Sequence, residues 1–429
     1  MKRKILMSIL TSITMYTWAQ ENPSEEAKKK RLDFAKTYFE LGGTFFPSFT
    51  GKSMVNNEVE TFKNSASFNQ YLTWGGFHFW GHAELYVTFP LNQTDFKKND
   101  QNSFEHKHSV VTGARFFPWV YQEKKIIPYV GVSWGALDFH QKSKPNEDQP
   151  FISKDFMMNY DIGVLYGYRN FSLRLGLNYF PDNKWQYPID KTNKEEIKTP
   201  NFAFQLGLLY SMDTSNNVDK ETRDKWNSYP RLSKQTLGSF KFGDFFVGVG
   251  PSMSFSLSKS EYNESQFPYL KNKITSKNYF DIAAGYHFYK AGIFTALSFR
   301  NPKFETEGYG SKQEIKKTSL ALEGNKFLTD YTGFAPYIGI NLAYDKLKYT
   351  ENADNLKQEI TFNKIEPGLT IGWDIRPGKN DEALILRTNF RWYPFSEFEV
   401  DGKKFKFSQL EYNLIQLVFY PEKLINKKK

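Results

Sequence analysis

The residues of this chain that could do chemistry are charged side chains set within short segments that alternate apolar and polar positions. Leucines alternate with polar residues along 171–180, for example, and Arg174 is one of the polar positions. A repeat of two residues indicates a β-strand, whose successive side chains point to opposite faces. The charges would therefore gather on one enclosed polar face. Ten residues belong to this candidate set: Glu84, Arg115, Asp161, Arg174, Arg300, Glu323, Glu366, Asp374, Arg387 and Arg391.

Charges of both signs on one enclosed face allow two interpretations. They could form an ion pathway or a polar-ligand site inside a pore, or they could neutralise one another as ion pairs that fill the interior. A charge withdrawn from bulk water needs a partner, and both signs occur in each half of the chain, so we favour ion pairs. Glycines expected on the same face indicate close packing rather than a wide bore. These are Gly131, Gly135, Gly163, Gly167, Gly176 and Gly207.

The other reactive residue types form no recognisable site. The chain has no cysteine, which excludes disulfides and a thiol nucleophile. His106 and His108 could contact one metal ion from the same side of a strand, but no third ligand accompanies them. No serine stands out as a nucleophile with a neighbouring base, and no phosphate-binding loop occurs. We therefore expect no enzyme activity, no metal and no other cofactor.

The elements that must position the charges are aromatic-rich strands with one apolar face. Aromatic residues make up 18% of the chain, its mean hydropathy is −0.60, and no later apolar run reaches the roughly 18 residues of a spanning helix. Such strands cross a bilayer only as a closed barrel, because every backbone amide in lipid must be paired. Along 126–140, the alternation directs Val130, Val132 and Trp134 towards lipid. Sixteen strands are predicted, at about 38–49, 68–78, 80–90, 106–118, 126–140, 154–168, 171–180, 201–212, 243–257, 277–289, 291–301, 316–328, 333–348, 360–375, 382–394 and 407–420.

The gaps between the first eight predicted strands are alternately long and short. The gap between 68–78 and 80–90 is almost nothing, whereas the gap after 126–140 holds the polar sequence KSKPNEDQPFIS. With the N-terminus in the periplasm, every long loop faces outwards and every short turn faces the periplasm. This asymmetry is expected of an outer-membrane barrel.

The two ends and the middle of the chain differ from the strands. A basic start (Lys2 to Lys4) precedes a moderately apolar stretch that ends in small residues before Gln20, which indicates a secretion signal. The middle segment is polar, with charges of both signs. We predict a signal peptide over 1–19, a periplasmic N-terminal segment over 20–37, a first eight-strand repeat over 38–211, a periplasmic linker over 212–241, a second eight-strand repeat over 242–421 and a basic tail over 422–429.

The strand pattern restarts after the linker. GFHFW, which begins at Gly76, returns as GYHFY at Gly285, and PYVGVS, which begins at Pro128, returns as PYIGIN at Pro336. Six such echoes follow one another in chain order at nearly one spacing. The spacing is too long for a solenoid or a propeller blade. We therefore predict an internal duplication of an eight-stranded meander.

On this pattern, each half resembles the small eight-stranded outer-membrane barrels of Gram-negative bacteria, apparently duplicated in tandem. The resemblance covers nearly the whole mature chain, and no motif ties it to one characterised family. It implies an up-and-down meander in the cell outer membrane. In such families the roles range from adhesion and membrane bracing to small pores and, rarely, lipid-modifying enzymes. The resemblance carries over no functional residues.

The predicted fold class is all-β, a transmembrane antiparallel up-and-down β-barrel of about 16 strands, and two arrangements satisfy it. One is a single sixteen-stranded barrel, which is wide enough to admit water. The other is two separate eight-stranded barrels, whose interiors side chains fill. We favour the single barrel, because the tandem arrangement requires a barrel to close in mid-chain.

The function that this organisation favours is porin-like passage of small polar solutes, narrowed by the luminal ion pairs and the outer loops. The alternative is a non-conducting structural or binding barrel that docks a partner in an envelope complex through its outer loops or the 212–241 linker. Outer-membrane lipid is a further expected partner. The formal net charge of +10 would suit a nucleic-acid binder, but an exported barrel does not meet nucleic acid.

Overall fold

The computed structural model of the chain describes residues 36–425, with breaks at 56–57, 65, 79–81, 93, 98–101, 109, 120–123, 144–151, 182, 189, 214–241, 271–273, 329–333, 354–355 and 376–382. The predicted signal peptide lies outside the described residues. So do almost all of the N-terminal segment and the linker, and the end of the basic tail. Among the described residues, no helix is long and apolar enough to cross a membrane.

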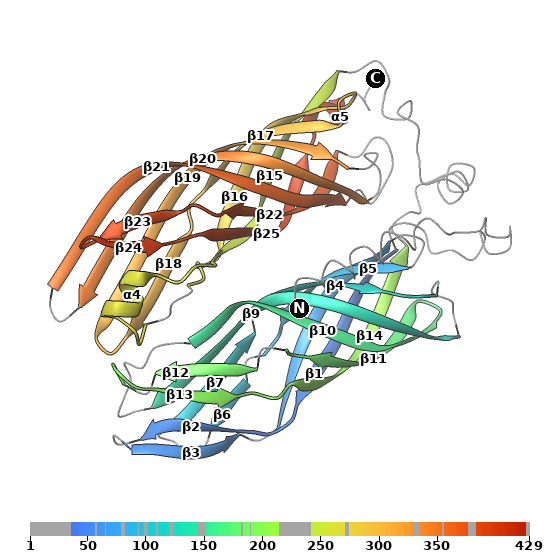
Figure 1. Cartoon of the computed structure of the whole chain (residues 1–429). Helices are drawn as coiled ribbons and strands as arrows, with labels where there is room; N and C mark the ends of the chain where they lie inside the picture. Colours follow the sequence, from blue (N-terminus) through green and yellow to red (C-terminus); the bar gives the residue numbers. More distant parts are fainter. Residues whose placement is uncertain are drawn as a thin grey trace.

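The first half of the chain forms a closed barrel of eight antiparallel strands (Figure 1). Each strand pairs with the next one along the barrel, and β14 returns to pair with β1, from Lys36 opposite Asp213 to Phe45 opposite Phe204. The strands are β1 (Lys36–Phe46), β4 (Ser67–His78), β5 (Ala83–Pro90), β8 (Val111–Phe116), β9 (Ile126–Ser143), β10 (Ile152–Tyr168), β11 (Phe171–Tyr179) and β14 (Phe202–Asp213).

The second half forms another closed barrel of eight antiparallel strands. Here β25 returns to pair with β15, with Val247 opposite Phe419 near one end and Ser256 opposite Gln409 at the other. The strands are β15 (Gly243–Ser256), β16 (Tyr279–Phe288), β17 (Ile293–Arg300), β19 (Ser311–Phe327), β20 (Phe334–Ala353), β21 (Leu356–Ile375), β22 (Leu384–Tyr393) and β25 (Gln409–Phe419).

The structure thus confirms an antiparallel barrel fold built from two eight-strand units. It also corrects our preference for a single sixteen-stranded barrel, because the chain forms two separate barrels. The physical reason lies at the edges of the first unit. The edge of β1 that a single barrel would offer to β25 is already hydrogen-bonded to β14. Neither unit leaves an unpaired barrel edge for the other to extend.

Additional short elements extend the long connections at one end of each barrel, which we call the long-loop end. The opposite end is the short-turn end. The first barrel carries β2 (Phe49–Val55), β3 (Glu58–Asn64), β6 (Thr94–Lys97), β7 (Asn102–His108), β12 (Lys184–Pro188) and β13 (Lys194–Lys198). The second carries α4 (Glu261–Gln266), β18 (Lys303–Gly308), β23 (Glu397–Val400) and β24 (Lys403–Lys406), and α5 (Pro421–Ile425) follows its last strand. In Figure 1 the two barrels lie side by side with their long-loop ends pointing the same way.

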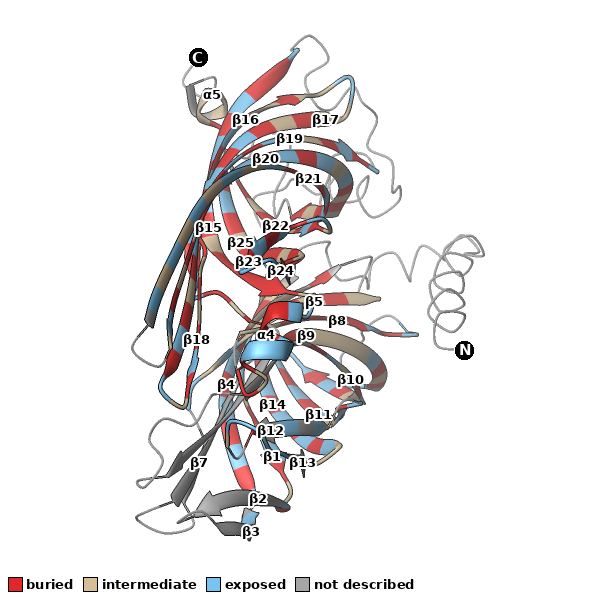
Figure 2. Ribbon diagram, turned by 60° about the vertical axis from the view of Figure 1, so that its left-hand side comes forward, coloured by how far each residue is buried: buried red, intermediate tan, exposed pale blue. Residues whose placement is uncertain are grey.

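Buried and exposed residues alternate along the strands, as Figure 2 shows for β19 and β20. The buried side chains point into the barrel and the exposed ones point out. The outward side chains are mostly large and apolar, which is the surface that membrane barrels present to lipid. Exposed examples are Leu173, Leu175, Leu206, Leu208, Ile338, Ile340, Leu369 and Ile371.

The two barrels touch through the outward faces of β8 and β9 in the first barrel and of β15, β22 and β25 in the second. Trp134, which we expected to face lipid, packs against Phe390 with a ring-centroid separation of 5.9 Å. The hydroxyl of Tyr412 donates a hydrogen bond to the hydroxyl of Thr112. Protein therefore replaces lipid over part of these faces. Four outward-pointing side chains of the second barrel are buried here: Met253, Phe255, Tyr412 and Leu414.

Candidate functional site

The interior of the first barrel is crossed by one connected network of ion pairs. Arg174 donates from Nε to Glu40 Oε2 (3.1 Å) and from Nη2 to Glu84 Oε1 (2.9 Å). Arg115 donates from Nη1 to the same Glu84 oxygen (2.8 Å) and from Nε to Asp161 Oδ2 (2.6 Å). These residues come from five different strands, and all five side chains are buried. The network therefore links opposite walls of the barrel.

Tyrosine side chains surround this network. The hydroxyl of Tyr38 donates to Glu84. The guanidinium of Arg115 lies 3.9 Å from the ring centroid of Tyr86 and 5.3 Å from that of Tyr129. A cation over an aromatic face is attracted by the ring quadrupole, and the attraction strengthens away from water. The phenol rings thus replace part of the hydration that the buried arginines lose.

The second barrel contains several buried ion pairs at different levels. Arg391 pairs with Asp281 and, at 2.8 Å, with Glu323. Arg300 pairs with Glu411, which also accepts from the Nζ of Lys317 at 3.1 Å. Several charges in this barrel therefore share partners across its interior, much as in the first barrel.

Three further ion pairs lie in the second barrel. Lys317 Nζ lies 2.7 Å from Asp345 Oδ2. Arg387 binds Asp374 through two hydrogen bonds of 2.7 and 2.8 Å, which is the bidentate geometry that a planar guanidinium favours. Glu366 is buried, and its carboxylate lies 3.5 Å from the Nζ of Lys364. Lys317, Arg387 and Glu366 thus each have an oppositely charged neighbour.

The structure places all ten residues of the candidate set inside the barrels. Each is buried, and each lies within ion-pair distance of an opposite charge. Glu84, Arg115, Asp161 and Arg174 come together in one network. The six of the second barrel divide among separate pairs, of which Arg391 with Glu323 and Arg387 with Asp374 join two members of the set.

Six charged partners in these ion pairs were missing from the sequence-based set. The alternation that identified Arg174 also covers them, since each shares one face of its strand with a small or polar residue two positions away. The missed residues are Glu40, Asp281, Lys317, Asp345, Lys364 and Glu411.

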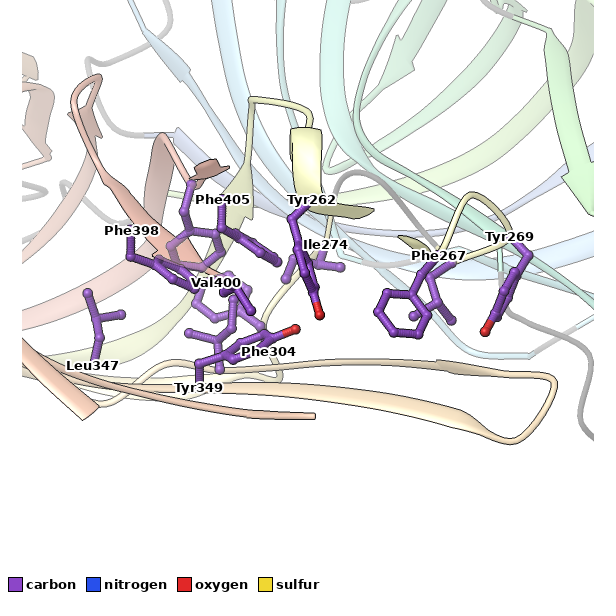
Figure 3. Close-up of a cluster of buried hydrophobic side chains, with 13 residues drawn as sticks. Tyr262, Phe267, Tyr269, Ile274, Phe304, Leu347, Tyr349, Phe398, Val400 and Phe405 are labelled. Carbon is purple, nitrogen blue, oxygen red and sulfur yellow. The ribbon is translucent and has the colours of Figure 1, made fainter. Parts of the chain in front are cut away.

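The two interiors differ beyond the ion pairs. The first barrel holds a cavity of about 100 Å³ between its network and its long-loop end, with Asn69 and Gln205 among the lining residues. The long-loop end of the second barrel is instead filled by a cluster of thirteen buried apolar and aromatic residues (Figure 3). These come from α4 and the segment after it, from β23, β24 and β18, and from the extended ends of β19 and β20. We call this cluster the cap.

The two histidines considered as metal ligands lie on a different strand from the one predicted. His106 and His108 lie on β7, which pairs with β6 and β9, and not at the start of the strand that we predicted over 106–118. Within the ranges that the structure describes, no group of three or more histidine, aspartate or glutamate residues is arranged to hold a metal ion.

The likenesses of this chain to the solved structures reported below have low scores. No protein-family profile and no curated protein matches the chain. Among solved structures, Neisserial surface protein A is 12% identical and covers 41% of this chain and 96% of its own, with a TM-score of 0.29. Ail of Yersinia pestis, in complex with the heparin analogue sucrose octasulfate, is 12% identical and covers 42% of this chain and 99% of its own, with a TM-score of 0.28.

A further solved structure aligns with most of the chain. The toluene transporter TodX of P. putida is 9% identical and covers 90% of both chains, with a TM-score of 0.18. Scores this low carry no argument. The closed strands and the outward apolar belt define the class directly: the chain is an integral outer-membrane β-barrel protein.

Proposed function

We propose that this protein is a non-conducting structural or binding barrel pair of the outer membrane. The observation that carries the proposal is the connected ion-pair network across the first barrel, together with the buried ion pairs of the second. An ion would have to displace these pairs in order to pass. Breaking a buried pair by removing one partner costs about 3–5 kcal/mol, because the other charge is left uncompensated. An eight-stranded barrel also has an interior that side chains fill.

Porin-like passage of small polar solutes is the second candidate. It is favoured by one observation, the cavity above the network of the first barrel, which would form the outer half of a path. Passage would require the network of Glu84, Arg115 and Arg174 to open. We propose no catalytic role for either barrel.

Planar-bilayer recording separates the two candidates. We expect the purified wild-type protein to give no steady current steps. Arg174→Ala, which removes the side chain that bridges Glu40 and Glu84, should conduct more than wild type if the network is what closes the barrel. Arg169→Ala is the matched control, because Arg169 is exposed at the turn between β10 and β11. Steady ohmic steps from the wild-type protein would overturn the proposal and support passage.

The partner of a non-conducting barrel would bind outside the membrane. We propose that the long-loop ends or the 212–241 linker dock a protein of the cell envelope, while the apolar belt contacts outer-membrane lipid. The cap of the second barrel supports this, because its buried side chains pack the long connections against one another. Co-purification from native membranes tests the proposal with the full chain and with residues 214–241 deleted. Identical co-purifying proteins in both samples would exclude the linker.

A further inference from the structure

The cavity of the first barrel lies between the ion-pair network and the long-loop end. Its lining residues come from the long-loop halves of their strands, among them Thr44, Asn69, Thr88, Asn178 and Gln205. Arg115, which also lines the cavity, belongs to the network beneath it. On the other side of the network, a buried aromatic cluster fills the short-turn half of the barrel. A ligand would therefore enter from the long-loop end.

The cavity presents polar groups that lack partners. Asn69 is 7% exposed, and neither its amide oxygen nor its amide nitrogen has a hydrogen-bond partner among the residues that the structure describes. The amide oxygen of Asn159, another lining residue, also has no hydrogen-bond partner among the described residues. Buried polar groups are normally hydrogen-bonded, and leaving one unpaired is costly. Donor and acceptor groups of this kind, aimed into a cavity, indicate an occupant that hydrogen-bonds to amides.

Hydrogen bonds to buried residues fix the orientation of the polar lining. Gln205 Nε2 donates to the hydroxyl of Tyr71 (2.7 Å), and that hydroxyl donates to Glu40 Oε1 (3.0 Å). Glu40 in turn is bound by Arg174. A chain of hydrogen bonds thus runs from the cavity wall into the ion-pair network. The network therefore fixes the orientation of the amide at the wall, which is how a preformed binding site is built.

Aromatic rings form the rest of the wall. Phe46 and Phe180 both line the cavity, and their ring centroids lie 5.6 Å apart. Tyr71 and Tyr86 add two further rings. Ligand sites commonly combine such apolar faces with a few convergent polar groups, and this combination suits a compound that has hydroxyls at its edge and C–H groups on its faces.

The charge of the lining selects among polar ligands. Arg115 is its charged residue, and the guanidinium is already bound to Glu84 and Asp161. No uncompensated charge of the described lining is left to attract an ion. The volume of about 100 Å³ has room for several water molecules, which is the space of one sugar ring rather than of a long chain.

We propose that this cavity binds a neutral polyhydroxyl compound, namely a sugar ring, either as a free monosaccharide or as the end of an oligosaccharide. The proposal goes beyond the non-conducting role, and the two fail separately. Current through the wild-type barrel would overturn the role and leave the sugar site standing, whereas absence of sugar binding would overturn the site and leave the role standing.

Saturation-transfer difference NMR on the full chain tests the proposal. The protein is folded in lauryldimethylamine oxide, a detergent that carries no sugar. The neutral probes are D-glucose, D-galactose, N-acetyl-D-glucosamine and maltotriose, and the charged ones are D-glucuronate and D-glucosamine. We expect saturation transfer to at least one neutral probe and none to the charged ones. Transfer to maltotriose alone would identify the end of an oligosaccharide as the ligand, and transfer to a monosaccharide would identify a free sugar.

Asn69→Leu removes the unpartnered amide at nearly constant volume and should weaken binding at least tenfold. Asn178→Leu, at another point of the lining, gives a second test if the first variant does not fold. The matched control is Asn325→Leu, because Asn325 is also a buried asparagine, inside the second barrel and away from the cavity. It should bind as wild type does. No transfer to any neutral probe, transfer only to a charged one, or equal binding by the folded lining variants would overturn the proposal.

Discussion

The two barrels have the same fold, but their long-loop ends are filled differently. The first leaves a polar cavity above its ion pairs, whereas the second fills the corresponding end with the cap. In the second barrel, β20 and β21 each have 20 residues, about twice the 9–11 that a membrane-spanning strand needs. The extra length carries their ends beyond the spanning region, where the cap packs on them. One architecture can therefore hold a polar cavity in one barrel and a packed apolar cluster in the other.

The largest expected effect comes from breaking the ion-pair network of the first barrel. Arg174→Met leaves the buried Glu40 without its ion-pair partner and should lower the free energy of unfolding by about 3–5 kcal/mol. Urea titration in detergent, followed by tryptophan fluorescence, measures the change. Adding Glu40→Gln to the variant should recover most of the loss, because Glu84 and Asp161 keep their ion pairs with Arg115 and no carboxylate of the network is then left without one. Equal instability of the single and double variants would show that lost packing, not charge, is responsible.

Removing a ring from the cap should loosen the second barrel only at its long-loop end. Phe405 is buried, stacked on Phe398 with ring centroids 4.5 Å apart. Truncating a buried phenylalanine costs about 3–5 kcal/mol, and we expect this cost to appear as local opening. Hydrogen exchange of the α4 amides should quicken in Phe405→Ala, while β15 and β25 exchange as before. The exposed Phe395 provides the control, since Phe395→Ala should change neither; faster exchange throughout the barrel would contradict a separate cap.

The contact between the barrels predicts a smaller effect. Tyr412→Phe removes the hydrogen bond to Thr112 and should cost about 1 kcal/mol in the unfolding titration. Tyr393→Phe serves as the control, because the Tyr393 hydroxyl has no hydrogen-bond partner among the described residues. If the free energy of unfolding fell equally in both variants, the hydrogen bond between the barrels would make no contribution to stability.

The smallest effect concerns the turn between β12 and β13, beside the second barrel. There, Tyr309 donates to the carbonyl of Pro188 at 3.1 Å. A hydrogen bond from the Asn193 side chain, joined by the backbone amides of Thr192 and Asn193, lowers the pKa of Asp190 to about 2. This carboxylate therefore stabilises the turn above its unfolded pKa of 3.8, and the contribution is lost as pH falls through about 2. The amide resonance of Thr192 should move with a midpoint near 2, and a midpoint near 4 would contradict the assignment.

Much of the fold could be predicted because the two-residue alternation is a local signal. The segment predicted at 126–140 is the strand Ile126–Ser143, and the one at 171–180 is Phe171–Tyr179. Which strands meet to close a barrel could not be predicted in the same way, because the alternation shows which face is apolar but not which strand an edge pairs with. The cap was missed for a related reason. Its residues around α4 follow no strand period, and they are buried only by packing between loops.

For the candidate site too, the sequence predicted which way side chains point but not which residues they contact. Alternation placed Glu84 and Arg174 on an inward face without showing that they share an ion pair across the barrel. Trp134 points outward as its position in the strand requires, yet its neighbour is Phe390 of the other barrel. The alternation in the sequence indicates whether a side chain points into or out of the barrel. The residue that this side chain contacts depends on how the barrels close and pack against each other.

Closure of the first barrel is the claim on which the others depend, and a cysteine-free chain allows it to be tested directly. Leu41 of β1 and Leu208 of β14 face each other across the closing seam and both point outward. Opposed residues of antiparallel strands lie about 4.5–5.5 Å apart at Cα, within the range that a disulfide spans. Oxidation of a folded Leu41→Cys, Leu208→Cys variant should give a disulfide in nearly all molecules, seen as a mobility shift without reductant. A folded variant that stays reduced would contradict two closed barrels and favour a single larger one.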